Sequence, residues 1–191
     1  TDIYINKQAT EEVVEKLSSP KVLHVATHGY FLPDEQAETD SDLAKEKATN
    51  NSLLRSGILL TNAGDLLSSN NVYEFNKEDG VLTAYEAMQL RLDDTELVVL
   101  SACETARGDV KVGDGVYGLQ RAFLVAGADA IIMSLFKVDD EATKKLMTYF
   151  YQNWEVKGMD KRQAFIEAKK TLRKEFKDPI YWGAFIMIGS I

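Results

Sequence analysis

The chain has 191 residues, 45% of them hydrophobic and 27% charged, which suits one globular domain with a sizeable core. Its formal net charge of −8 argues against nucleic acid as a partner, because binding phosphate needs concentrated Lys and Arg. No apolar run approaches the roughly 20 residues of a membrane-spanning helix, so we expect no membrane partner. A single cysteine cannot form an internal disulfide, which favours the reducing cytoplasm.

In chain order, short apolar segments alternate with longer amphipathic ones. The short segments are nearly unbroken and rich in Val and Ile, which predicts strands buried on both faces; they cover residues 21–27, 96–102, 128–135 and 183–189, with a further strand in 57–64. The amphipathic segments have apolar residues at helical spacing; they cover residues 11–17, 83–90, 113–128, 139–154 and 161–176. This alternation predicts an α/β fold with a mostly parallel sheet flanked by helices.

Two polar stretches interrupt this pattern. Residues 32–52 are acidic and nearly aperiodic, and residues 66–80 mix turn residues with a possible short strand. We interpret both as surface insertions, so that residues 1–191 form a single domain. The chain opens with Thr1 and enters an apolar pattern at once, which favours a segment of a longer protein.

Cys103, the only cysteine, follows the apolar run "ELVVLSA" directly. A cysteine is usually a small buried residue. One at the end of a strand, before a glycine-rich stretch, is accessible to chemistry if a second residue can activate it.

The only two histidines lie together in "VLHVATHGYF". His24 falls inside the apolar run and is expected to pack in the core, whereas His28 falls where the run ends. The carboxyl ends of parallel strands share one edge of a sheet, so His28 and Cys103 are candidates for a dyad in which the imidazole takes the thiol proton. The alternative is a buried cysteine and a turn histidine that never meet.

At this point four segments together resemble a known family. They are "HVATHGYF", "LVVLSACETARGDVKVGDGVYGLQRAFLVAGADAIIMSLFKVDDEAT", "LMTYFY" and "IYWGAFIMIG". In this order they resemble a CHAT domain, the caspase-like peptidase domain that is related to separase and often follows tetratricopeptide repeats. The similarity runs from about residue 9 to residue 189.

The resemblance implies a caspase-like fold with helices on both faces of the sheet. It implies His28 as the catalytic histidine, Cys103 as the nucleophile, and the backbone amides of Gly29 and Cys103 as the oxyanion hole. A plain turn glycine is the alternative for Gly29. The family generally has a further strand and helix before the first residue here, and upstream repeats or a sensor domain that activate it.

In the similar block of separase an acidic residue receives a basic side chain of the substrate, and Asp139 and Asp140 are the matching candidates. The alternative is that one of them caps the helix that follows. No cofactor is implied, since two histidines and one cysteine do not offer a closed zinc site. The glycine-rich stretch 108–118 also lacks a nucleotide-binding pattern.

The leading hypothesis is therefore a cysteine endopeptidase that cleaves a protein substrate and is switched on by a partner or an upstream sensor domain. One alternative is a catalytically silent interaction or signalling module that kept the caspase-like fold. A third interpretation, a small-molecule α/β domain, would need a phosphate loop or a cofactor motif, and the sequence has neither.

Overall fold

A computed structural model of the chain describes residues 1–31, 53–54, 56–64, 79–101, 114–136 and 139–190. Its main sheet has four strands in the order β1-β5-β6-β7. The strands are β1 (Val22–Val25), β5 (Leu97–Leu100), β6 (Ala130–Ser134) and β7 (Phe185–Gly189). β1, β5 and β6 run parallel, and β7 is antiparallel to β6. The predicted α/β fold with a mostly parallel sheet is confirmed.

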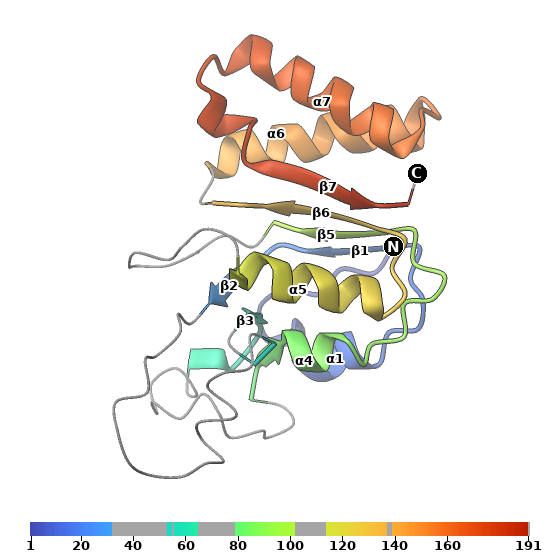
Figure 1. Cartoon of the computed structure of the whole chain (residues 1–191), viewed down its shortest axis with the longest axis vertical. Coiled ribbons are helices and arrows are strands. Elements are labelled where there is room, and N and C mark those ends of the chain that lie inside the picture. The colour runs from blue at the N-terminus through green and yellow to red at the C-terminus, as the bar shows by residue number, and fades with distance from the viewer. Residues whose placement is uncertain (32–52, 55, 65–78, 102–113, 137–138, 191) are drawn as a thin grey trace.

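The direction of β7 follows from the two helices that precede it. α6 (Asp140–Tyr151) and α7 (Lys161–Glu175) lie side by side and are joined through the π-helical turn η2 (Gln152–Val156). A strand, two antiparallel helices and a second strand return the chain in the opposite direction, as the arrows of β6 and β7 show (Figure 1).

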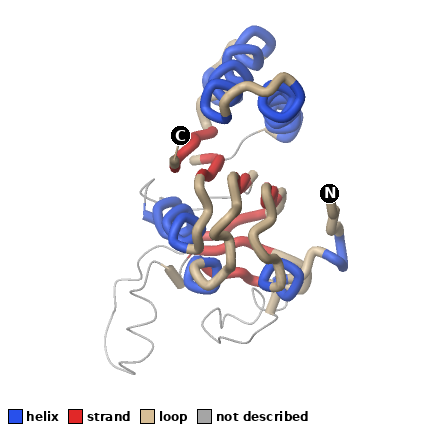
Figure 2. Tube along the Cα trace, turned by 90° about the vertical axis from the view of Figure 1, so that its right-hand side faces the viewer, coloured by secondary structure: helices blue, strands red, loops and turns tan. Residues whose placement is uncertain are grey.

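Helices cover both faces of the main sheet, as expected (Figures 1 and 2). Side chains of β5 alternate between the two faces: Leu97 and Val99 pack in the core under α6 and α7, whereas Val98 and Leu100 pack in the core with α5 (Asp114–Val125). All four are at most 1% exposed, so β5 is buried on both faces, which explains its continuous apolar sequence.

Two short helices contribute buried residues to the same core as α5, and each begins at a capping threonine. α1 (Glu11–Glu15) starts at Thr10, whose hydroxyl accepts a hydrogen bond from the Val13 amide. α4 (Ala84–Ala87) starts with a full capping box between Thr83 and Glu86. The chain also forms two 3-10 turns, η1 (Asn6–Gln8) and η3 (Pro179–Tyr181).

A second sheet lies at the end of the main sheet to which β1, β5 and β6 point (Figure 1). It is antiparallel, in the order β2-β3-β4, and consists of β2 (His28–Phe31), β3 (Ser56–Leu59) and β4 (Val81–Thr83). Of these strands only β3 was predicted. Residues 32–52 and 65–78, which hold most of the two predicted insertions, lie outside the described residues.

No helix in the described ranges is long and apolar enough to cross a membrane.

Candidate active site

A cavity of about 600 Å³ lies where β1 and β5 end and α6 begins. Its wall consists of eleven residues from three regions of the chain: His24, Ala26, Thr27, His28, Ser101, Asp140, Thr143, Lys144, Met147, Thr148 and Tyr151. The cavity therefore combines the carboxyl ends of parallel strands, where ligands bind in open α/β sheets, with one face of a helix.

His28 lines this cavity and is exposed to solvent. β1 ends three residues earlier, at Val25, so His28 follows the end of a parallel strand, as the sequence predicted. It also begins β2, where it lies opposite Leu59 of β3. The hydroxyl of Thr27 donates to the carbonyl of Leu59, which holds the turn between β1 and β2 against the second sheet.

Gly29 follows His28 in β2 and lies opposite Ile58. It is half-buried. The glycine is thus part of a paired strand and lies beside the cavity residue His28, where its small size lets another chain approach closely.

Cys103 belongs to residues 102–113, which lie outside the described part of the chain. The last residue described before it is Ser101, which lines the same cavity as His28. The distance between the His28 imidazole and the Cys103 sulfur therefore stays a prediction.

The prediction that His24 packs in the core is wrong. Leu23 and Val25 of β1 are buried, but His24 points to the other face of this edge strand, is exposed, and lines the cavity. Its Nδ1 lies 3.2 Å from the Tyr151 hydroxyl and its Nε2 lies 3.4 Å from the Ser101 hydroxyl. An apolar run does not reveal that one face of its strand is open, although the spacing of four between the two histidines was a usable signal.

The rings of His24 and Tyr151 lie side by side in the cavity wall, with ring centroids 5.9 Å apart. Desolvation lowers the pKa of His24 below its ordinary value of 6.5. Burial, together with the charge of Glu155, raises the pKa of Tyr151 to about 12. At neutral pH the imidazole is thus uncharged and the phenol keeps its proton.

Asp139 and Asp140 have different positions. A carboxylate oxygen of Asp139 accepts a hydrogen bond of 2.9 Å from the Ala142 amide, so this residue is the N-cap of α6. Asp140 is exposed and lines the cavity, and so does Lys144, one helical turn later. Sequence reasoning did not find Lys144 or Tyr151, because a helix pattern shows which face is apolar but not which polar residues meet a distant strand.

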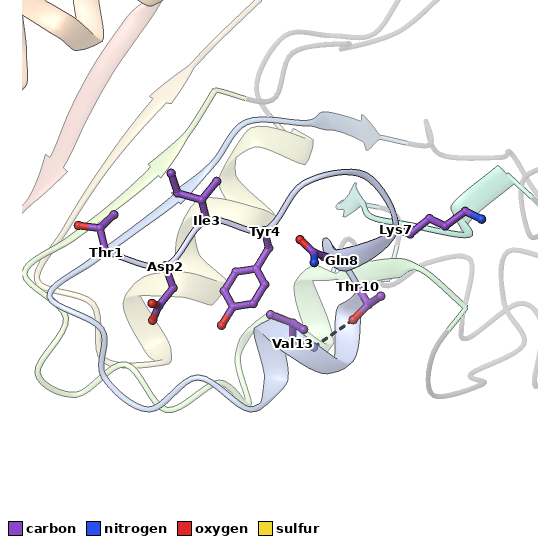
Figure 3. A pocket seen from close by; sticks show the side chains of 8 residues that line it. All are labelled: Thr1, Asp2, Ile3, Tyr4, Lys7, Gln8, Thr10 and Val13. Carbon is purple, nitrogen blue, oxygen red and sulfur yellow. Dashed lines mark hydrogen bonds between the residues drawn. The ribbon is translucent and has the colours of Figure 1, made fainter.

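A second hollow, of about 590 Å³, is bounded by the amino-terminal segment and α1, and none of the candidate catalytic residues lines it (Figure 3). Within the described ranges, no group of three or more His, Cys, Asp or Glu residues is arranged to hold a metal ion.

Comparison with known proteins agrees with this architecture. The family model of the CHAT domain matches residues 1–190. Over 112 residues, or 58% of this chain, the sequence is 38% identical to tetratricopeptide repeat protein 28 of Mus musculus. It is 37% identical to tetratricopeptide repeat protein 28 of Homo sapiens over the same length. The matched segment is only 4% of each of these relatives. Because the family model covers nearly the whole sequence, this chain belongs to the CHAT domain family.

Proposed function

We propose that this CHAT domain is a cysteine endopeptidase with His28 and Cys103 as its catalytic dyad. His28 takes the proton of the Cys103 thiol, and the thiolate attacks the scissile carbonyl. The same imidazole then gives the proton to the leaving amine as the peptide bond breaks, and water hydrolyses the thioester to release the acid and free the thiol.

One observation carries this proposal: His28 and Ser101 line the same cavity, and Ser101 stands only two residues before Cys103. Three residues of chain span at most about 11 Å, so Cys103 has a short reach from the carboxyl end of β5 at Leu100. His28 follows the adjacent parallel strand, β1, at the same end of the sheet.

We assign the oxyanion hole to the backbone amides of Gly29 and Cys103. Such donors stabilise the charge that develops on the carbonyl oxygen, and each contributes roughly 2.7–4 kcal/mol in comparable enzymes. The position of Gly29 directly after His28 supports this assignment, because the donor then lies beside the group that moves the proton.

The substrate in this proposal is an extended segment of a protein, with a basic side chain before the cleaved bond. Asp140 is the carboxylate that receives it, because it lines the cavity while Asp139 caps α6. Asp139 contributes to substrate binding only indirectly in this proposal, because it caps the helix that carries Asp140.

Regulation by a linked domain is also part of the proposal. Both relatives are named as tetratricopeptide repeat proteins. This supports a natural polypeptide in which such repeats, or another sensor domain, control the activity of this single domain. We place the protein in the cytoplasm, where a lone cysteine stays reduced. Equal, high peptide turnover by the isolated chain and by the full-length protein, with and without its partner, would contradict this control.

Turnover of a peptide library by the full-length protein tests the proposal. Cys103→Ala and His28→Ala should each abolish cleavage without changing the circular dichroism spectrum, whereas Thr171→Val, a hydroxyl loss on the distant helix α7, should keep it. Full activity in Cys103→Ala would remove the nucleophile assignment. A protein that cleaves nothing, with or without its partner, would favour the silent interaction module.

A further inference from the structure

We infer that His24 is a positioning residue of the proposed active site: Tyr151 orients its ring, and the ring holds Ser101, from which the chain continues to Cys103. This inference rests on the proposed function and concerns a histidine that takes no part in the proton transfer itself. It assigns a role to three polar side chains that line the cavity and contact one another.

The contacts form one continuous relay from α6 to the end of β1. The Tyr151 hydroxyl lies 3.2 Å from Nδ1 of His24, and the Ser101 hydroxyl lies 3.4 Å from Nε2. The Ser101 hydroxyl in turn lies 3.5 Å from the carbonyl of Val25, and the Ser101 amide donates to the same carbonyl at 3.0 Å. Ser101 is thus tied to β1 through both its backbone and its side chain.

With an uncharged ring, only one arrangement of the hydrogens lets all three side-chain contacts be hydrogen bonds at the same time. The Tyr151 hydroxyl donates to Nδ1, Nε2–H donates to the Ser101 hydroxyl, and that hydroxyl donates to Val25. This arrangement needs a neutral imidazole that carries its proton on Nε2. A protonated ring would donate from both nitrogens, and Tyr151 would have to turn its hydroxyl away to accept.

The surroundings favour the neutral ring. Desolvation lowers the pKa of His24, and burial raises the pKa of the Tyr151 phenol that faces it to about 12. The charged groups that line the same cavity are Asp140 and Lys144 of α6, one of each sign. The charge of Glu155, in the turn after α6, contributes to the raised pKa of Tyr151, whereas the lowered pKa of His24 is due to desolvation.

Both ring nitrogens of His24 have protein partners, so this side chain has no free nitrogen to offer a thiol or a substrate. Its effect is therefore indirect. Distances of 3.2 and 3.4 Å are long for hydrogen bonds, and such contacts often tighten only when substrate is bound. The relay is then expected to act on the catalytic step more than on substrate binding.

Three variants of the full-length protein test the relay. His24→Leu removes both hydrogen bonds, His24→Gln keeps a donor at the position of Nε2, and Tyr151→Phe removes only the hydroxyl. Tyr149→Phe is the matched control. It removes a hydroxyl from the same helix, α6, but that hydroxyl donates to Glu175 and not to His24.

The loss of one such hydrogen bond corresponds to a fall of roughly 3- to 10-fold in kcat. We expect at least that loss in His24→Leu, which removes two such bonds, with KM nearly unchanged. We also expect partial rescue in His24→Gln, a smaller loss in Tyr151→Phe, and none in Tyr149→Phe. Adding Tyr151→Phe to His24→Leu should cost nothing further, since the relay is already broken. Wild-type kcat in His24→Leu, or additive losses in the double variant, would overturn the inference.

A second readout does not depend on turnover. Nitrogen chemical shifts of the His24 ring should show the Nε2–H tautomer in the wild type, and Tyr151→Phe should change the tautomer population or the titration midpoint. If the wild type cleaves no peptide but shows this response, the proposed function fails and the relay stands. An Nδ1–H tautomer that Tyr151→Phe leaves unchanged would overturn the relay, whatever the activity.

Discussion

Val25 and Leu100 lie opposite each other in the parallel pair β1 and β5, as the last residue of each strand. His28 follows Val25 by three residues, and Cys103 follows Leu100 by three residues. Adjacent strands are about 4.8 Å apart, so Ala26 and Ser101, the first residues after the two strands, leave the sheet side by side. This register supports the proposal that His28 and Cys103, which are far apart in sequence, act together.

Asp140 and Lys144 of α6 place one carboxylate and one ammonium group in the cavity wall. The substrate side chain that the protein prefers before the cleaved bond, basic or acidic, shows which of the two groups binds it. We expect Asp140→Asn to lower kcat/KM for an arginine peptide by roughly 10-fold or more, because a hydrogen-bonded charge pair is lost. Lys144→Met should leave cleavage of that peptide intact or improve it. Parallel kinetics with arginine and aspartate peptides provide the measurement.

A preference for the aspartate peptide that Lys144→Met abolishes would show that the ammonium group, and not Asp140, selects the substrate.

Glu11 is a buried carboxylate in α1 that is only 2% exposed and accepts a hydrogen bond of 3.2 Å from the Gly80 amide. Burial raises its pKa from 4.5 to about 7, with smaller contributions from the charges of Glu86 and Asp79. The folded state therefore binds this proton more tightly than the unfolded state. Ionisation of Glu11 lowers the free energy of unfolding progressively as pH rises from about 4.5 to about 7.

Glu11→Gln removes this ionisation and keeps an oxygen that can accept from Gly80. We expect it to stabilise the protein at pH 8, by an amount on the order of 3 kcal/mol, and to change little near pH 4.5. Denaturant unfolding at both pH values measures the difference. Glu15→Gln, which removes the same charge from an exposed position of α1, is the control; an equal gain in both variants would show a net-charge effect instead.

Gly127 ends the segment of α5 with φ +108°, and a Cβ built there would lie 2.7 Å from Cα of Asp93. Gly158 also has a positive φ, +68°, but a Cβ there would meet nothing within 4 Å. The two positions differ both in the space around the Cβ and in φ, which lies farther from the left-handed region at Gly127. Gly158→Ala should lose roughly 1–2 kcal/mol from backbone conformation alone, and Gly127→Ala should lose a further 1–3 kcal/mol from the collision.

Equal melting temperatures for the two alanine variants would show that the loop at Asp93 moves away at no cost.

Sequence predicted the elements whose signals are local. The continuous apolar runs became the four strands of the main sheet, because strands buried on both faces need no polar alternation. The helix starts are local as well: the caps at Thr10 and Thr83 each depend on one side-chain oxygen and a few neighbouring residues, and the alternative that one of Asp139 and Asp140 caps α6 is confirmed for Asp139. His28 was found by the same logic, since it stands where an apolar run ends.

Relationships between distant segments were not predictable in this way. β2 and β4 have four and three residues, too few for a periodic pattern, and they form only by pairing with β3 on either side. The exposure of His24 depends on where α6 passes β1. Lys144 and Tyr151 joined the cavity for the same reason, because the position of one helix across a sheet is not encoded in its own spacing.

The central claim, that Cys103 attacks a carbonyl with help from His28, is tested most directly by a peptidyl acyloxymethyl ketone and mass spectrometry. This reagent forms a thioether with a nucleophilic cysteine, and trypsin would release residues 92–107 with the label on Cys103. The account predicts labelling of that peptide in the wild-type protein, a rate that falls by roughly 100-fold or more in His28→Ala, and parallel loss of turnover. Labelling of Cys103 at the same rate with and without His28, in a protein that cleaves its peptide, would contradict the dyad.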